Sequence, residues 1–283
     1  MRIIGEKING TRKQVAAAIA GRDADFIRSL ARQQAEAGAH WLDVNAGTPP
    51  QREPEDLTWL VQTVQAAVQL PLCLDSTNPQ ALAAALKEVK RAPLINSISG
   101  EPARLEGILP IAIEHGCEVI ALAMDDRGIA TTAEARLEVI RRLFEATRRA
   151  GMRDNGVYID PLVMTVATNT ESARITLDVI RAVRAEFPDA HVSLGLSNVS
   201  FGLPARALIN RTFLTLALAA GIDTAMIDPT DRELRAALFA AELLLGQDKH
   251  CLGYVRAYRA GLLGPVKAPA EAKSAGQKAG AAS

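Results

Sequence analysis

Polar side chains recur where short apolar segments of this chain end. Asp75 and Asp160 each follow three consecutive apolar or aromatic residues, and Asn96 follows a Leu-Ile pair. Asn198 comes just after another apolar segment. Carboxylates accept hydrogen bonds, whereas carboxamides both donate and accept them. Such a set could bind a planar heterocycle that has an amino-amide edge.

The complete set of such residues extends to nearly every apolar segment. It consists of Glu6, Asn9, Asp43, Asn45, Asp75, Asn96, Asp160, Ser197, Asn198 and Asp228. Any one of them alone could simply cap the following helix or shape a turn. Several at one end of a sheet favour a ligand site, because burying unpaired amides and carboxylates is costly.

Short apolar segments alternate with stretches of helical periodicity along the whole chain. Eight segments have the length of strands, at residues 2–6, 41–45, 72–75, 94–97, 119–123, 157–160, 192–196 and 224–228. Between them apolar residues recur at helical spacing, as at Leu234, Leu238 and Ala241. This alternation predicts an α/β fold with a parallel sheet, and eight repeats predict a closed (β/α)8 TIM barrel. Active sites of such barrels lie at the carboxyl ends of the strands, where the polar residues fall.

The chain has the length of one such barrel followed by a short extension. Residues 1–263 of the 283 are expected to form a single barrel domain that ends in a helix over 251–263. Residues 264–283 consist mostly of Ala, Lys, Gly, Ser and Pro. This composition predicts a disordered, low-complexity tail.

Composition excludes several classes of function. The 32 basic and 32 acidic residues balance, and only 4% of residues are aromatic, so a nucleic-acid binder is not expected. Cys73, Cys117 and Cys251 are too far apart for a disulfide framework or a CxxC motif. The N-terminal sequence MRIIGEK reaches charged residues too soon for a signal-peptide core, and no apolar segment has the length of a membrane span. These features predict a cytoplasmic protein that does not bind membranes.

Conventional catalytic motifs do not occur. There is no GxSxG sequence, and none of the four histidines ends an apolar segment, so a Ser-His or Cys-His mechanism has no evident base. The HxH and HExxH spacings of metal centres are also missing, and no metal site is predicted. Gly-rich phosphate loops are absent as well.

Six segments, five of which contain these polar residues, follow one another in a specific order. They are IGEKING at 4–10, LCLDSTN at 72–78, INS at 95–97, YIDPL at 158–162, LGLSNVS at 194–200 and LINRTF at 208–213. Together they resemble the methyltetrahydrofolate:corrinoid protein methyltransferases, whose pterin-binding barrel also occurs as the folate domain of cobalamin-dependent methionine synthase. The resemblance extends from the first strand to about Arg259 and implies the same barrel here.

The resemblance also implies roles for individual residues. Asp75, Asn96 and Asp160 match the positions that bind the amino-pyrimidinone edge of the pterin. Asn198 matches the residue near pterin N5, the atom that carries the transferred methyl group, and is the implied catalytic residue. Arg206 matches a basic position on the folate side. The resemblance further implies that Glu6, Ser197 and Ile227 are neighbours of the pocket.

The implied activity is transfer of the N5-methyl group between methyltetrahydrofolate and the cobalt of a corrinoid. The chain contains no DxHxxG corrinoid-binding motif, so the corrinoid is expected on a partner protein that binds transiently. Members of the family are usually homodimers, and the resemblance implies a homodimer here.

Two alternative functions remain open at this point. A dihydropteroate synthase-like condensation shares the pterin pocket but needs a Lys-x-x-Arg cluster at the seventh strand, where this chain has LSN. The other alternative is a non-catalytic folate-binding subunit, against which Asn198 beside the pterin-edge residues argues. Asp75 and Asp160 could also be helix caps, and Arg206 a surface cation of little energetic weight.

Overall fold

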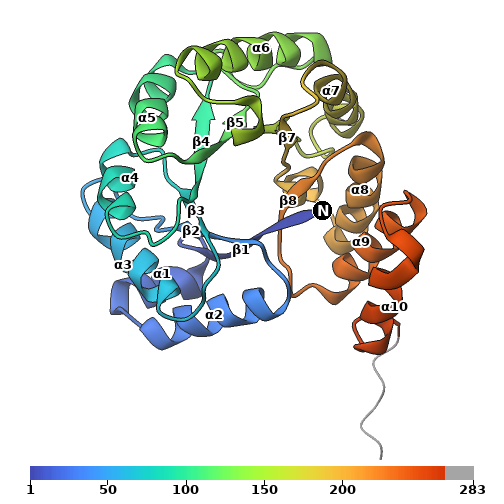
Figure 1. Cartoon of the computed structure of the whole chain (residues 1–283), viewed down its shortest axis with the longest axis horizontal. Helices are drawn as coiled ribbons and strands as arrows, with labels where there is room; N and C mark the ends of the chain where they lie inside the picture. The colour runs from blue at the N-terminus through green and yellow to red at the C-terminus, as the bar shows by residue number, and fades with distance from the viewer. Residues whose placement is uncertain (265–283) are drawn as a thin grey trace, which may run out of the picture.

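Eight parallel strands form the centre of the molecule, and helices surround them (Figure 1). The computed structural model describes residues 1–264. Neighbouring strands pair in the order β7-β6-β5-β4-β3-β2-β1-β8, and every ladder is parallel. The strands are β1 (Arg2–Asn9), β2 (Trp41–Asn45), β3 (Leu72–Asp75), β4 (Leu94–Ser99), β5 (Glu118–Leu122), β6 (Val157–Asp160), β7 (His191–Val192) and β8 (Thr224–Ile227).

The two edges of the sheet meet just beyond β7. Gly195 and Met226 form a parallel bridge, and the Met226 N–H donates to the Leu194 carbonyl over 3.0 Å. These contacts bring the chain after β7 against β8, so the sheet curves into a barrel. The predicted α/β fold, a single (β/α)8 TIM barrel, is therefore confirmed.

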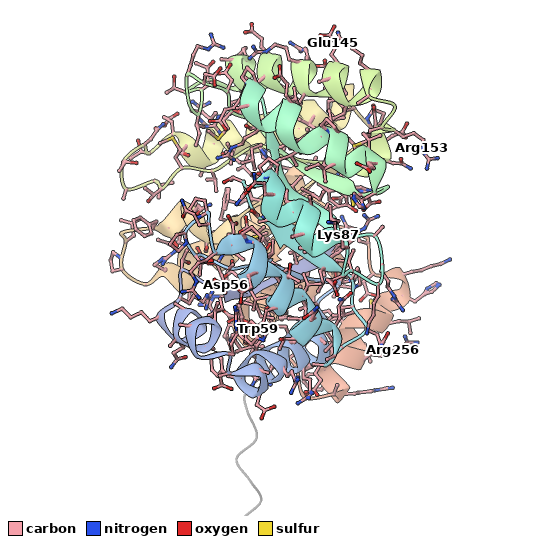
Figure 2. All side chains as sticks on the ribbon, turned by 90° about the vertical axis from the view of Figure 1, so that its left-hand side faces the viewer. Asp56, Trp59, Lys87, Glu145, Arg153 and Arg256 are labelled. Carbon is pink, nitrogen blue, oxygen red and sulfur yellow. The ribbon has the colours of Figure 1, made fainter. Side chains whose placement is uncertain are left out.

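Helices form the outer layer because each has an apolar face that packs on the sheet. In α6, Val139, Ile140 and Leu143 are buried, whereas Glu145 lies exposed on the outside of the molecule (Figure 2). The α-helices are α1 (Lys13–Gly21), α2 (Ala24–Glu36), α3 (Glu53–Gln65), α4 (Pro79–Leu86), α5 (Pro102–Glu114), α6 (Ala133–Arg149), α7 (Ser172–Glu186), α8 (Arg206–Ala220), α9 (Arg232–Leu244) and α10 (Leu252–Arg259). In the described part of the chain, no helix combines the length and apolarity that a bilayer span requires.

The seventh strand is shorter than predicted. The sequence predicted a strand over residues 192–196, but only two residues pair regularly, and the 3-10 helix η2 (Leu196–Ser200) follows. The segment resembles a strand in sequence because Val192, Leu194 and Leu196 alternate with small residues, and all three of these apolar side chains are buried. The N–H of Gly195 donates instead to the Asp160 carboxylate over 3.3 Å. The chain thus leaves the sheet at the point where it enters the predicted site.

Side chains fill the inside of the barrel. Ile4, Cys73, Leu94, Ile120 and Tyr158 form a separate cluster there, and none of them is more than 3% exposed. The interior is therefore a packed core and not a pore, as is general for barrels of this class. A ligand can bind only at an end of the barrel.

A hydrogen-bonded network occupies the amino-terminal end of the barrel. The Arg2 guanidinium donates to the Tyr158 hydroxyl over 2.6 Å and lies 3.1 Å from His191 Nε2. His191 Nδ1 lies 2.7 Å from an oxygen of Asp223. Because this end is filled by side chains that bond to one another, the carboxyl end is the place to look for a ligand site.

The last helix is also shorter than predicted. It covers Leu252–Arg259, and Gly261 follows it with a φ of 71°, a left-handed conformation typical of helix ends. The sequence predicted a helix over 251–263 and a tail over 264–283. Apart from its first residue, that tail lies outside the described residues, and the domain boundary at 263 stays a prediction.

Candidate active site

The three residues expected to bind the pterin edge face inward at one end of the barrel. Side chains two positions apart on a strand face the same side of the sheet. Asp75, Asn96 and Asp160 each lie two residues beyond a member of the interior cluster, so they lie at its carboxyl-terminal side. Asp75 and Asn96 are direct partners in the β3–β4 ladder. The fold therefore gathers all three at one barrel mouth.

Asp160 accepts hydrogen bonds from two backbone N–H groups. Its Oδ1 accepts from Leu162 over 2.8 Å, and its Oδ2 accepts from Gly195 over 3.3 Å. Burial raises the pKa of Asp160 to about 6, although these two bonds and the charge of Arg136 lower it. At neutral pH this carboxyl is mostly ionised and poorly hydrated. N–H donors of a ligand would stabilise that state.

Asp75 has a raised pKa for a similar reason. Burial raises it to about 6, and a hydrogen bond from Asn45 counteracts this. The Nδ2 of Asn45 donates to Asp75 Oδ2 over 3.0 Å and to the Asp75 carbonyl over 3.2 Å. Asn45 ends β2 and was assigned no role from the sequence. Its position shows that it orients Asp75.

Asn96 contacts a deeper carboxyl that the sequence analysis named but gave no role. The Nδ2 of Asn96 lies 3.5 Å from Asp43 Oδ1. Asp43 is 0% exposed, and its burial together with the nearby Asp75 holds its pKa well above the ordinary value. Burial thus favours the protonated form of Asp43. Its Oδ2 has no hydrogen-bond partner among residues 1–264.

Asn198 lies beside Asp160 on η2. A Cβ atom on residue 195 would lie 3.2 Å from Asn198 Nδ2 and 3.9 Å from Asp160 Oδ2. Because residue 195 is Gly195, both polar groups can approach the backbone at this point. Asn198 is exposed, so its carboxamide is accessible to a ligand in the mouth.

Arg206, the first residue of α8, fixes the turn that carries Asn198. Its Nη2 donates to the Ser197 carbonyl over 2.8 Å, and its Nε donates to Ser200 Oγ over 3.0 Å. Its guanidinium also lies 5.8 Å from the centre of the Phe201 ring. That Arg206 and Ser197 contact the folate stays a prediction. Their contact with each other stabilises η2.

Glu6 belongs to a charged group on the β1 and β8 side of the mouth. The ammonium of Lys7 lies 3.0 Å from Asp228 Oδ2, and Arg12 lies 3.6 Å from Glu6. Burial raises the pKa of Glu6, and Arg12 lowers it. Ile227 packs in the main hydrophobic core. The charges on this side are largely paired, whereas Asp75 and Asp160 across the mouth form no ion pair within residues 1–264.

Two other expectations concern local structure and metals. The Oδ1 of Asn9 accepts hydrogen bonds from the N–H and the hydroxyl of Thr11, over 3.0 and 2.6 Å, so Asn9 shapes a turn. Within residues 1–264 there is no group of three or more His, Cys, Asp or Glu side chains arranged to hold a metal ion. The mouth thus offers carboxylates and carboxamides as its binding groups, which suits a flat, nitrogen-rich heterocycle.

Comparison with known proteins points to the same class of ligand. The chain matches the Pterin binding enzyme family over residues 5–228. The methylcorrinoid:tetrahydrofolate methyltransferase of Eubacterium limosum is 42% identical over 270 residues, which cover 95% of this chain and 100% of that protein. The methionine synthase of Mycobacterium tuberculosis is 32% identical over 238 residues, which cover 80% of this chain and 20% of that protein.

Solved structures of dihydropteroate synthases share the fold. The enzyme of Coxiella burnetii, in complex with pteroic acid, has a TM-score of 0.65 at 15% identity, over 86% of this chain and 94% of that chain. The enzyme of Xanthomonas albilineans, in complex with 7,8-dihydropteroate, has a TM-score of 0.62 at 18% identity, over 88% and 93%. At these identities the likeness shows the fold alone. The family match and the full-length relative establish that this chain belongs to the pterin-binding enzymes, together with the methylcorrinoid:tetrahydrofolate methyltransferase.

Proposed function

We propose that the chain catalyses methyl transfer between a methylcorrinoid and N5 of tetrahydrofolate, with the corrinoid carried by a partner protein. The observation that carries this proposal is the 42% identity, over 95% of the chain, to a protein of that activity. This chain matches that relative along its whole length. We take the direction from methylcorrinoid to tetrahydrofolate, as in the name of the relative.

Asp75, Asn96 and Asp160 would bind the amino-pyrimidinone edge of the pterin. The amino and ring N–H groups of that edge can donate hydrogen bonds to the two carboxylates. Its carbonyl can accept a hydrogen bond from the Asn96 carboxamide. The position of the three side chains at one mouth supports this assignment. So do the pKa values of about 6 for Asp75 and Asp160, which leave both carboxyls mostly ionised at pH 7.

Asn198 would act on N5 during the transfer. The N5 lone pair forms the new bond to the methyl carbon, while the electron pair of the cobalt–carbon bond stays with the corrinoid and N5 releases its proton to water. Before that release, N5 carries a positive charge and an N–H bond. The carboxamide oxygen of Asn198 can accept a hydrogen bond from this N–H group. An interaction that strengthens as charge develops accelerates the step.

The corrinoid has to approach from solvent. The barrel interior is packed, and Asn198 is exposed at the mouth. A partner protein would therefore present its corrinoid over the mouth and then leave, because it must also meet its methyl donor. A small interface suits such a transient complex. A homodimer and a cytoplasmic location stay predictions.

A corrinoid-dependent assay tests the proposal. The purified chain is incubated without oxygen with tetrahydrofolate and methylcobalamin, and methyltetrahydrofolate is measured by chromatography. We expect product only when the methylcorrinoid is present. Folate binding without product, with free methylcobalamin and with a methylated corrinoid protein, would contradict the enzyme and support a binding subunit. Dihydropteroate formed from a pterin diphosphate and p-aminobenzoate would support the other alternative.

A further inference from the structure

Arg136 in the first turn of α6 is the largest fully buried side chain of the described chain. Its Nε donates to the Ala130 carbonyl over 2.8 Å, in the loop between β5 and α6. Its Nη1 donates to the Pro161 and Leu162 carbonyls, in the loop that follows β6, and to the Thr176 hydroxyl. The guanidinium thus joins two loops of the barrel mouth from behind.

The charge of Arg136 has no ion-pair partner. A guanidinium stays protonated even when it is buried, and a buried charge without a counterion is expensive. Among residues 1–264 no carboxylate lies within 4 Å of Arg136, and its Nη2 has no hydrogen-bond partner. Burial lowers the pKa of Arg136, and the charge of Asp160 raises it. Asp160, a predicted pterin ligand, is therefore the acid that interacts with this buried cation.

A short chain of contacts connects Arg136 to the Asp160 carboxylate. Leu162 has a φ of 60°, which a residue with a side chain adopts only when its surroundings fix it. Its carbonyl accepts from Arg136 and, over 3.0 Å, from Thr176. Its N–H donates to Asp160 Oδ1 over 2.8 Å. The peptide that orients Asp160 is therefore fixed by Arg136.

We propose that Arg136 is a positioning residue of the pterin site, which orients the Asp160 carboxylate toward the pterin N–H donors through Leu162 and places a buried positive charge behind it. The part of this proposal that concerns the pterin rests on the proposed function. The effect on the ionisation of Asp160 does not depend on it, because both groups belong to this chain.

Other charged groups around Asp160 are compensated or lie far along the strand, and the carboxyls of Asp75 and Asp43 are on β3 and β2, which β4 and β5 separate from β6. In the β5–α6 loop, Asp125 pairs with Arg127 over 2.9 Å and with Arg142 over 2.6 Å. From the chain after β7 the neutral groups of Gly195 and Asn198 face Asp160. From α7 the neutral hydroxyl of Thr176 packs behind the loop. At the opposite end of β6 are the ionisable groups of Tyr158, Glu118, Arg2, His191 and Asp223. In the described chain, the charge that lowers the pKa of Asp160 is that of Arg136.

Carboxyl titration by NMR tests the effect on Asp160 directly. The chain is labelled with 13C at Asp side chains, and the Asp160 signal is assigned with Asp160→Asn. The Leu162 N–H bond and the charge of Arg136 both lower the pKa of Asp160, and Arg136→Gln removes this charge and one of the bonds that fix Leu162. The proton affinity of Asp160 should therefore rise about tenfold. Arg141→Gln removes a charge from the same helix but from an exposed pair with Glu186, and should leave Asp160 unchanged. An unchanged Asp160 titration in folded Arg136→Gln would overturn the proposal.

Folate binding separates the charge effect from a purely structural one. By calorimetry, Arg136→Gln should weaken tetrahydrofolate binding about threefold or more at pH 6.5. The difference from wild type should be smaller at pH 9, where Asp160 ionises in both proteins and only the effect on its orientation remains. Thr176→Val removes a tether of Leu162 but keeps the charge, so it should not shift the pH profile. The proposal would be overturned if Arg136→Gln lowered the affinity for tetrahydrofolate as much at pH 9 as at pH 6.5. It would also be overturned if the substitution lowered the affinity by the same factor in a protein that already carries Asp160→Asn. Absence of binding by wild type would contradict the proposed function instead.

A measurement on the unaltered Arg136 covers the case in which Arg136→Gln does not fold. The Nε–H resonance of Arg136 should shift with pH at the midpoint of the Asp160 titration, and this shift should vanish in Asp160→Asn. Asp160 lies at the mouth, so its replacement by the isosteric amide is compatible with folding. A resonance that shows the same pH dependence in Asp160→Asn would overturn the proposal.

Discussion

The buried carboxyls of the mouth destabilise the free protein at neutral pH. Asp160 keeps its proton in the folded state up to about pH 6, whereas its ordinary pKa is 3.8. Between these two values the folded state binds more protons than the unfolded state. Raising the pH through this window therefore lowers the free energy of unfolding. A ligand with N–H donors recovers part of this loss, which links the stability of the site to its occupation.

Asp160→Asn should flatten the pH dependence of stability. Without the carboxyl, the decrease in the free energy of unfolding between pH 4 and pH 7 should shrink by about 1–3 kcal/mol. Urea unfolding at both pH values measures the difference. Asp25→Asn is the control, because Asp25 is 96% exposed and should leave the pH dependence as it is. An unchanged slope in Asp160→Asn would contradict the raised pKa.

Two carboxamides of the mouth should have separable effects. Asn96→Ala leaves pterin and Asp43 groups unpaired, so folate binding should weaken by about 1–3 kcal/mol. Asn198→Ala removes an acceptor that matters most once N5 is charged, so turnover should fall about 10²-fold while affinity changes little. Calorimetry and the corrinoid assay provide the two values. Normal turnover with weak binding in Asn198→Ala would show that Asn198 only recognises the folate.

The sequence predicted the mouth residues better than their supports. Asp75 and Asp160 end strands, and alternation along a strand places them on the inner side without any knowledge of the packing. The burial of Arg136 could not be predicted, because an arginine in a charged amphipathic helix is expected on the surface. Its burial depends on contacts with a loop that is distant in sequence. Asn45 gave a partial signal, since it ends a strand, but its bond to Asp75 depends on strand order.

At the scale of elements, η2 positions the carboxamide of Asn198, the proposed catalytic group. Regular pairing ends two residues into β7, and the chain then turns so that Asn198 faces the mouth. Arg206 stabilises this turn from α8, and Gly195 leaves room between Asn198 and Asp160. The sequence predicted a longer strand here because apolar residues alternate through Leu196. Tertiary hydrogen bonds to the loop after β6 decide against the strand, and these are not visible in local periodicity.

Gly195→Ala should disturb catalysis more than folding. The backbone at Gly195 has a φ of −74°, which alanine adopts without strain. The added Cβ would lie 3.2 Å from Asn198 Nδ2, so the carboxamide has to move. A small displacement of a catalytic group lowers turnover, here by about tenfold or more. Gly156→Ala, whose Cβ would make only an ordinary contact with Met152, is the control. Wild-type turnover in Gly195→Ala would contradict the placement of Asn198.

At the scale of the molecule, the barrel leaves one end for chemistry. The interior cluster blocks passage through the barrel, and the network around Arg2 fills the amino-terminal end. For the proposed function, folate and corrinoid would therefore meet at the same mouth, with the folate deeper among Asp75 and Asp160 and the corrinoid on the solvent side of Asn198. The overall barrel could be predicted because eight apolar segments and their helical spacers repeat along the chain. The way in which the barrel closes at Gly195 could not be predicted, since an isolated bridge to Met226 takes the place of a regular strand ladder there.

Deletion of residues 265–283 should leave the barrel and its chemistry intact. This segment has Val266 as its one large aliphatic side chain and no aromatic residue, so it has little apolar surface to pack on the barrel. The main chain before it is anchored, since the Arg232 guanidinium donates to the carbonyls of Gly261 and Gly264. We expect the melting temperature and methyl transfer from free methylcobalamin to match those of the full chain. Transfer from a protein-bound methylcorrinoid should match as well, because Asn198 and the pterin residues lie far from the deletion in sequence and within the barrel. A loss confined to the protein-bound corrinoid would contradict this prediction and assign the segment a role in binding the partner.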